Sequence, residues 1–239
     1  MSEKQAPIAI VLAQYPDEER ARREEAMRNA APYGQDVMFV EIQTSVYVKG
    51  LTDYHRMLAA PLVARAAVEA EQAGAAAVIP YGTLDLGIEE ARHVVDIPVL
   101  GPGRSGTHMA ANLGRRISII CYDQPHVVMF RRLLPSWGFT DEITSIRPVD
   151  ITVTDMSKDV AALRRAFVEQ SKRAIEEEGA EVILPLGMTM VPVLIPASEL
   201  TEEIGVPVVD PIAAAISMAS CLSATGAKNS RVAYPRVTI

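Results

Sequence analysis

The sequence predicts an α/β protein of two similar halves, each a mostly parallel sheet flanked by helices, with a cleft between the halves. Three observations support this fold class. Short runs rich in Val and Ile alternate with longer helical patterns, which is typical of parallel strands covered on both faces. Aromatic residues make up only 5% of the chain, which suits small-residue helices packed on β-branched strands. Segments of the first half also recur in the second half.

In the first half, apolar runs and helical spacing alternate regularly. The run IAIVLA predicts a buried strand at residues 8–13. Gly74 follows the expected helix at residues 61–73 and is expected to be its C-cap. The expected strands of this half are residues 8–13, 36–42, 75–80 and 97–100, and the expected helices are residues 17–30, 61–73, 88–94 and 107–113.

The second half repeats this alternation. We expect Pro135 to stop one helix and Gly179 to end the long amphipathic helix. The tail from Lys228 to Ile239 has no periodicity that predicts an element. The expected strands are residues 117–122, 181–185 and 206–209 with an edge strand within 143–151, and the expected helices are residues 127–134, 159–178, 199–203 and 212–224.

An internal repeat predicts how the chain is organised. GAAAVIPYGT from Gly74 matches GAEVILPLGM from Gly179 at an offset of 105 residues, and IPVLGP from Ile97 matches VPVVDP from Val206 at an offset of 109. Ordered matches at a nearly constant offset indicate a duplication. We therefore expect halves at residues 1–114 and 115–239, with exchange of strands or helices between them allowed.

Charge and cysteine usage exclude several classes of protein. The chain has 23 Lys and Arg against 30 Asp and Glu, a net charge of −7, which argues against a nucleic-acid partner. Cys121 and Cys221 are too few for a disulfide framework or a zinc cluster. Residues 1–7 do not read as a signal peptide, and no apolar run reaches the roughly 18 residues of a membrane span. We expect a cytoplasmic protein without a membrane partner.

Two loops follow equivalent strands of the halves and are candidate ligand sites. In the loop YGTLDLG, Gly82 permits close approach of a ligand, and Thr83 with the N–H groups of the next helix could hold a carboxylate. Asp85 is either the N-cap of that helix or an acid–base group. Because ligands of open parallel sheets bind at the carboxyl ends of strands, we expect this loop on one side of the cleft.

The loop LGMTM occupies the equivalent place in the second half. It offers Gly187, Met188 and Thr189 as substrate-binding residues, on the side of the cleft that faces Gly82. Any such loop is a turn, and it is the match between the two loops that points to a shared binding role.

Four segments of the chain together carry a resemblance to a known family. They are GTLDLGIEEAR from Gly82, IPVLGPGRSGTHMA from Ile97, ISIICYDQPHVVMFRRLL from Ile117 and GAEVILPLGMTM from Gly179. In their order and spacing they resemble the aspartate/glutamate/hydantoin racemase superfamily, to which arylmalonate decarboxylases and maleate isomerases are related. The resemblance covers approximately residues 8 to 225 and implies a cofactor-independent isomerase, expected to be a homo-oligomer, acting on a small anionic or cyclic amide substrate.

The thiol pair of these racemases has no counterpart here. In the family each of the two loops opens with a cysteine, and the pair removes and returns the α-proton from opposite faces. Here the first position falls on Gly82 and the second on Gly187, or on Met188 if the loop slips by one residue. Cys121 and Cys221 match neither position. We therefore expect proton transfer without the usual thiol pair.

The resemblance also implies which residues remain in the site. In the decarboxylase branch a Gly-Thr pair and a later Tyr bind a carboxylate, which corresponds here to Gly82, Thr83 and Tyr122. Tyr122 could also act as an acid or base. His108 at the start of a predicted helix is a further candidate, and His126, on the loop after Tyr122 and Asp123, could face the same cleft. We therefore expect Asp85, His108 and Tyr122 to be the catalytic residues.

The sequence also allows other functions. The chain could be a decarboxylase-like lyase or a hydrolase that uses Asp, His and Tyr groups, or a non-catalytic protein that binds small carboxylates. The four histidines show no metal-ligand spacing, although Asp85, His108 and Asp210 could together form a metal site. Residues 46–56, with Lys49, form either part of a lid or an exposed polar loop.

Overall fold

The computed structural model describes residues 6–43 and 53–239. The chain divides into two compact units, the first made of residues 1–102 and 215–239 and the second of residues 103–214. The halves expected from the repeat divide the chain elsewhere, because residues 215–239 belong to the first unit. Of the expected lid segment, residues 46–52 with Lys49 lie outside the described residues, as do residues 1–5.

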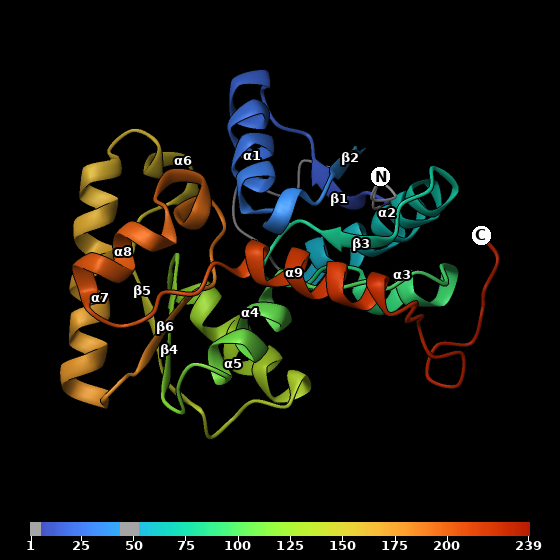
Figure 1. Ribbon diagram of the computed structural model, residues 1–239. Coiled ribbons are helices and arrows are strands. Elements are labelled where there is room, and N and C mark those ends of the chain that lie inside the picture. Colours follow the sequence, from blue (N-terminus) through green and yellow to red (C-terminus); the bar gives the residue numbers. More distant parts are fainter. Residues whose placement is uncertain (1–5, 44–52) are drawn as a thin grey trace. The chain divides into compact units, whose positions relative to one another are not determined.

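The first unit contains a three-stranded parallel sheet in the order β2-β1-β3 (Figure 1). Every residue of β1 is buried, and the alanine-rich face of α2 packs with apolar residues of β1, β3 and α3 in one core. Small side chains on α2 therefore allow the helix to lie close to β-branched strands, as the composition indicates. The elements are β1 (Ile8–Ala13), α1 (Asp17–Ala30), a short 3₁₀ turn (Pro32–Gly34), β2 (Val37–Ile42), α2 (Asp53–Gln72), β3 (Ala77–Pro80) and α3 (Ile88–Val94).

The second unit contains a matching sheet in the order β5-β4-β6 (Figure 1). Its core joins β4 and β6 to α7, α8 and the segment after β6. The last helix, α9 (Pro211–Ala224), crosses the boundary between the units. The other elements are α4 (Pro102–Ala111), β4 (Ile117–Cys121), α5 (Gln124–Trp137), β5 (Ile143–Pro148), α6 (Val153–Met156), α7 (Val160–Glu178), β6 (Val182–Pro185), a helical turn (Thr189–Leu194) and α8 (Ala197–Ile204).

The strand register repeats the sequence offsets. Ile8 of β1 pairs with Ala77 of β3, and Ile117 of β4 pairs with Val182 of β6, so the two strand positions recur at offsets of 109 and 105. The hydrogen bonds that lead into the two loops also correspond: the Tyr81 N–H donates to the Val11 carbonyl and the Leu186 N–H to the Ile120 carbonyl, both at 2.9 Å. The predicted α/β fold with two similar parallel sheets is confirmed.

The predicted bounds of two helices were wrong because each helix continues through a proline. The second helix begins at Asp53 rather than at residue 61, and Pro61 lies inside it. Likewise Pro135 lies inside α5, which continues to Trp137. Each proline removes one helical hydrogen bond, but the apolar faces of these helices are buried on both sides of the proline, and this packing outweighs the local cost. Residues 53–56 of the expected lid or polar loop are therefore helical.

Two other expectations need correction. The helix expected at residues 107–113 begins at Pro102, so His108 lies in its second turn and not at its start. Glycines 103 and 106 disfavour a helix, yet an added Cβ at Gly106 would lie 3.0 Å from Leu184, so close packing explains one of them. The expected strands at residues 97–100 and 206–209 form only single bridges, Val78 to Val99 and Ile183 to Val208.

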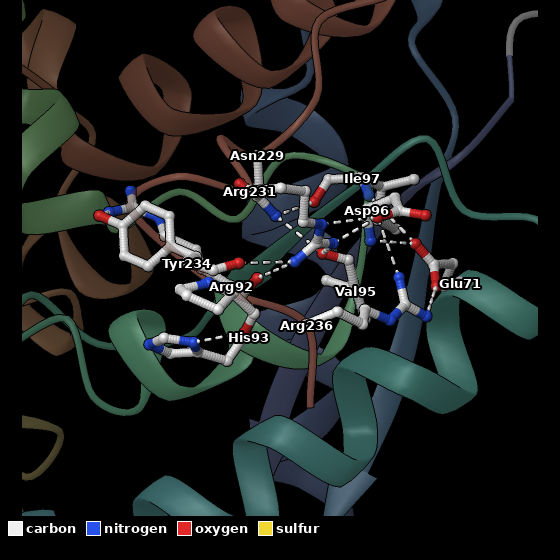
Figure 2. A network of polar contacts seen from close by, with 11 residues as sticks. Glu71, Arg92, His93, Val95, Asp96, Ile97, Asn229, Arg231, Tyr234 and Arg236 are labelled. Carbon is white, nitrogen blue, oxygen red and sulfur yellow. Dashed lines mark hydrogen bonds and ion pairs between the residues drawn. The ribbon is translucent and has the colours of Figure 1, made fainter. Parts of the chain in front are cut away.

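The C-terminal tail is held on the first unit by a polar network (Figure 2). Figure 2 shows the Asp96 carboxylate beside the guanidinium groups of Arg231 and Arg236, with Glu71 of α2 nearby, and the distances from Asp96 Oδ1 to Arg231 Nε and Arg236 Nη1 are both 2.9 Å. Charged side chains rather than an apolar face fix this segment, so it has no readable periodicity. Other contacts join Asn229 to the Val95 and Ile97 carbonyls, Arg92 to the Tyr234 hydroxyl, and the Val237 N–H to the His93 carbonyl.

Candidate active site

The loop YGTLDLG leaves the carboxyl end of β3 in a tight turn. Gly82 has a φ of 136°, a conformation that favours glycine. The Asp85 N–H donates to the Gly82 carbonyl at 3.2 Å and closes the turn. Thr83 is buried. The strand-to-helix turn predicted from the sequence is therefore present. It brings Gly82 and Thr83 to the carboxyl ends of the strands, where ligands of parallel sheets bind.

The side chain of Asp85 lies against the backbone of Gly101. A Cβ added at Gly101 would lie 2.1 Å from Asp85 Oδ2. In the repeat, Gly101 corresponds to Asp210, whose carboxylate accepts from the N–H groups of Ile212 and Ala213 at 2.9 and 3.2 Å. A carboxylate therefore lies at this point in both units, supplied by Asp210 itself in the second and by Asp85 from the neighbouring loop in the first. Desolvation raises the pKa of Asp210 to about 6.

The loop LGMTM is buried and packs against Tyr122 at the carboxyl end of β4. The Thr189 N–H donates to the Tyr122 hydroxyl oxygen at 3.1 Å. A Cβ added at Gly187 would lie 2.6 Å from Tyr122 Cε1 and 2.6 Å from Met190 Cε. The Tyr122 ring therefore takes the space into which a side chain at residue 187 would project. The backbone N–H of Thr189, a residue expected to bind substrate, thus holds the tyrosine.

Two further side chains flank Tyr122. The ring of His126 is buried and meets the Tyr122 ring edge-on, with 5.0 Å between the ring centroids. Its Nδ1 lies 2.6 Å from Asp123 Oδ1, and the same carboxylate oxygen accepts from the His126 N–H as the N-cap of α5. The structure thus brings Tyr122, Asp123 and His126 together at the carboxyl end of β4.

His108 lies beside Phe139 in an edge contact, with 4.8 Å between the ring centroids. Phe139 follows α5 and precedes β5, so it is near the amino end of β5, opposite the edge at which Tyr122 leaves β4. Burial, and to a lesser extent the charge of Arg104, lower the pKa of His108. Within the second unit, His108 therefore lies near the amino ends of the strands, and Tyr122 lies at their carboxyl ends.

The two cysteines occupy unlike positions. Cys121 is fully buried in β4, and burial, with the charges of Asp123 and Asp150, raises the pKa of its thiol to about 12. A thiol with this pKa is not ionised at neutral pH, and the thiolate is the reactive form. Cys221 is exposed on α9. Neither cysteine lies in the loops YGTLDLG or LGMTM.

Sequence reasoning passed over one cluster of the first unit. Arg23 of α1 is buried and donates to the Tyr81 hydroxyl oxygen at 2.8 Å. The only signal in the sequence was the position of Tyr81 directly before Gly82. Among residues 6–43 and 53–239, no group of three or more His, Cys, Asp and Glu side chains could hold a metal ion. In the same part of the chain, no helix is both long and apolar enough to cross a membrane.

Comparison with known proteins places this chain in the isomerase/racemase class of enzymes. The model of the Asp/Glu/Hydantoin racemase family matches residues 18–219, and this chain belongs to that family. Among curated proteins, it is 29% identical to the hydantoin racemase of Pseudomonas sp. (strain NS671) over 210 residues, 87% of this chain and 82% of that protein. It is also 31% identical to a hydantoin racemase of Rhizobium meliloti over 156 residues, 64% of each chain.

Solved structures share the fold. Allantoin racemase from Klebsiella pneumoniae superposes with a TM-score of 0.87 at 24% identity, over 98% of this chain and 95% of that chain. A glycine-to-cysteine mutant of arylmalonate decarboxylase, in its sulfate ion associated form, superposes with a TM-score of 0.58 at 19% identity, over 92% of this chain and 95% of that chain. The expected relation to both racemases and the decarboxylase is confirmed at the level of the fold.

Proposed function

We propose that this racemase-type enzyme moves the proton on the carbon next to a carbonyl group in a hydantoin-type cyclic amide or a small carboxylate, with Tyr122 in place of a thiol. The contact between Tyr122 and Gly187 carries the proposal. The resemblance to the family implies that one of its two cysteines corresponds to residue 187 or 188, and here the tyrosine ring lies where a side chain at residue 187 would project.

The surroundings of the Tyr122 hydroxyl suit an acid–base role. The Thr189 N–H donates to its oxygen, and a hydrogen bond to the charged form of a group favours that form. This donor therefore stabilises the phenolate that takes the substrate proton. The phenol that results can return a proton, and acid–base catalysis of this kind contributes roughly 100- to 10,000-fold to a rate.

Hydantoin-type substrates fit this chemistry. The curated relatives are hydantoin racemases, and in a hydantoin the carbon that carries the side chain lies between a ring carbonyl and a ring nitrogen. Loss of its proton gives an enolate whose charge is on the carbonyl oxygen. We propose that Thr83 and the backbone at Gly82 donate to that oxygen, because donors fixed in a turn need little reorganisation.

Isotope exchange tests the proposal. One enantiomer of a 5-alkyl hydantoin, and separately a 2-substituted small carboxylate, is incubated with the protein in D₂O. We expect solvent deuterium at the carbon next to the carbonyl, followed by loss of optical rotation, for at least one of these probes. The Tyr122→Phe variant keeps the ring and should lose most of this exchange. Tight binding of both probes with no exchange would contradict the proposed reaction, as would full activity of the folded Tyr122→Phe variant.

A further inference from the structure

A buried arginine in the first unit has no role in the chemistry described so far. Arg23 is only 2% exposed. Its Nη1 donates to the Tyr81 hydroxyl oxygen at 2.8 Å, its Nε donates to Glu19 Oε1 at 3.1 Å, and its guanidinium lies 4.2 Å from the Tyr15 ring centroid. Burial opposes the charge, but the two tyrosines and Glu19 outweigh it and raise the pKa of Arg23 above its ordinary value.

The cluster lies at the edge of the sheet where the candidate site is. Tyr15 follows the carboxyl end of β1, and Tyr81 follows the carboxyl end of the neighbouring strand β3. Tyr81 is also the residue directly before Gly82, where the first thiol position of the family falls. In open parallel sheets this edge is the one that binds ligands. A buried cation that reaches this edge is costly unless its charge is used or compensated.

The hydrogen bond has a defined direction. Arg23 has only donors, so the Tyr81 oxygen accepts, and the phenol proton plays no part in this bond. Glu19 occupies the Nε edge of the guanidinium, whereas Tyr81 is on Nη1. The phenol oxygen therefore meets the positive group directly. A positive charge at this distance favours phenolate over phenol, which lowers the pKa of a tyrosine.

We propose that Tyr81 is a second acid–base residue of the reaction and that Arg23 is its positioning residue. This inference rests on the proposed function and names the group that acts in the first unit, where Gly82 carries no side chain. For the enantiomer whose proton Tyr122 does not take, the Tyr81 phenolate takes the proton from the substrate carbon, and the electron pair of the broken C–H bond moves onto the carbonyl oxygen as an enolate. Return of a proton from Tyr81 restores the starting enantiomer with a solvent label, and protonation of the opposite face by another acid inverts it.

The test compares two Arg–Tyr pairs of the first unit. Tyr81→Phe removes the hydroxyl from the proposed pair. The control is Tyr234→Phe, which removes a hydroxyl from a comparable pair in the polar network of the C-terminal tail (Figure 2). There Arg92 donates to the Tyr234 hydroxyl oxygen at 2.9 Å. We expect Tyr81→Phe to lower deuterium exchange into the hydantoin probe roughly 100-fold or more, with Tyr234→Phe unchanged. Equal effects of the two variants would overturn the proposal.

The pH dependence separates positioning from mere stability. In Arg23→Met the phenolate is no longer favoured, so the rise of the exchange rate with pH should move to higher pH by about one unit or more, while the plateau at high pH is retained. Arg23→Lys, which keeps the charge, should show a smaller displacement. A plateau that falls at every pH without a displacement, in folded Arg23→Met or Arg23→Lys protein, would contradict a positioning role.

A spectroscopic titration separates this inference from the proposed function. Ultraviolet absorbance of phenolate, followed against pH, should show an early-ionising tyrosine that is missing from Tyr81→Phe but present in Tyr234→Phe. This result needs no substrate, so it stands even if no exchange is found with either probe. If wild-type protein exchanges the probe but its early-ionising phenol is unchanged in Tyr81→Phe, the proposed function survives and the inference about Tyr81 fails.

Discussion

Gly187→Ala is the change whose effect the structure determines most closely. The new Cβ would lie 2.6 Å from Tyr122 Cε1 and 2.9 Å from its Cζ, whereas carbon atoms in good contact are about 3.5 Å apart or more. The flexible end of Met190, also 2.6 Å away, can turn aside. The Tyr122 ring must move by most of 1 Å, and that movement strains its hydrogen bond from Thr189.

The expected consequences follow from this displacement. Overpacking of a buried site costs about 1–3 kcal/mol, so the free energy of unfolding, measured in denaturant, should fall by about this amount. A displacement near 1 Å of an acid–base group can cost up to roughly 100-fold in rate. Deuterium exchange into the hydantoin probe should therefore fall by about 10- to 100-fold.

A double-mutant cycle gives the control. In a Tyr122→Ala background the added methyl group has room, so Gly187→Ala should lose most of its effect on stability. In a Met190→Ala background it should keep that effect, since the tyrosine ring is still in place. Undiminished exchange by folded Gly187→Ala protein, or an equal loss of stability with and without the ring, would refute the reasoning.

Four other substitutions test separate parts of the structure. The pKa of Asp210 is about 6 in the folded protein against about 3.9 in the unfolded chain. The stability that this group contributes is therefore present below pH 4 and is lost as the pH rises through 6. Asp210→Asn should abolish this loss of about 3 kcal/mol, measured in unfolding curves between pH 4 and 7. A Cβ in Gly101→Ala would lie 2.1 Å from Asp85 Oδ2, so stability should fall by about 1–3 kcal/mol, and less in an Asp85→Ala background. Gly82→Val places a branched side chain at a φ of 136°, so it should abolish binding of the hydantoin probe in a titration. Thr83→Val should weaken this binding by about 0.5–3 kcal/mol. Unchanged affinity in both folded variants would place the ligand elsewhere.

The repeat made much of the fold predictable. Its two offsets, 105 and 109, correspond to the strand register of both sheets, because a duplicated strand keeps its pairing partner. Where the prediction failed, long-range packing overrode a local signal. Pro61 and Pro135 disfavour helix locally, but buried apolar faces continue past both. The tail is fixed by Arg231 and Arg236 on Asp96, ion pairs that leave no periodic pattern in the sequence.

The site was predictable only in part. Gly82 and Gly187 could be found because they follow matching strands. The contact of the Tyr122 ring with Gly187 could not, since the two residues are far apart in the sequence and only the close packing of loop on strand brings them together. The same holds for Arg23 and Tyr81, which are 58 residues apart. A buried Arg–Tyr pair has no spacing by which a sequence could reveal it.

The claim that proton transfer here uses tyrosine rather than thiol chemistry has one direct measurement. Deuterium exchange into the hydantoin probe is compared between wild-type protein, a cysteine-free variant with Cys121→Ala and Cys221→Ser, and Tyr122→Phe, after unfolding curves show that each is folded. The cysteine-free variant should exchange at close to the wild-type rate, because the Cys121 thiol, with a pKa of about 12, is not ionised at neutral pH. Tyr122→Phe should be slower by roughly 100- to 10,000-fold. A folded cysteine-free protein without exchange, beside a fully active Tyr122→Phe protein, would contradict the claim.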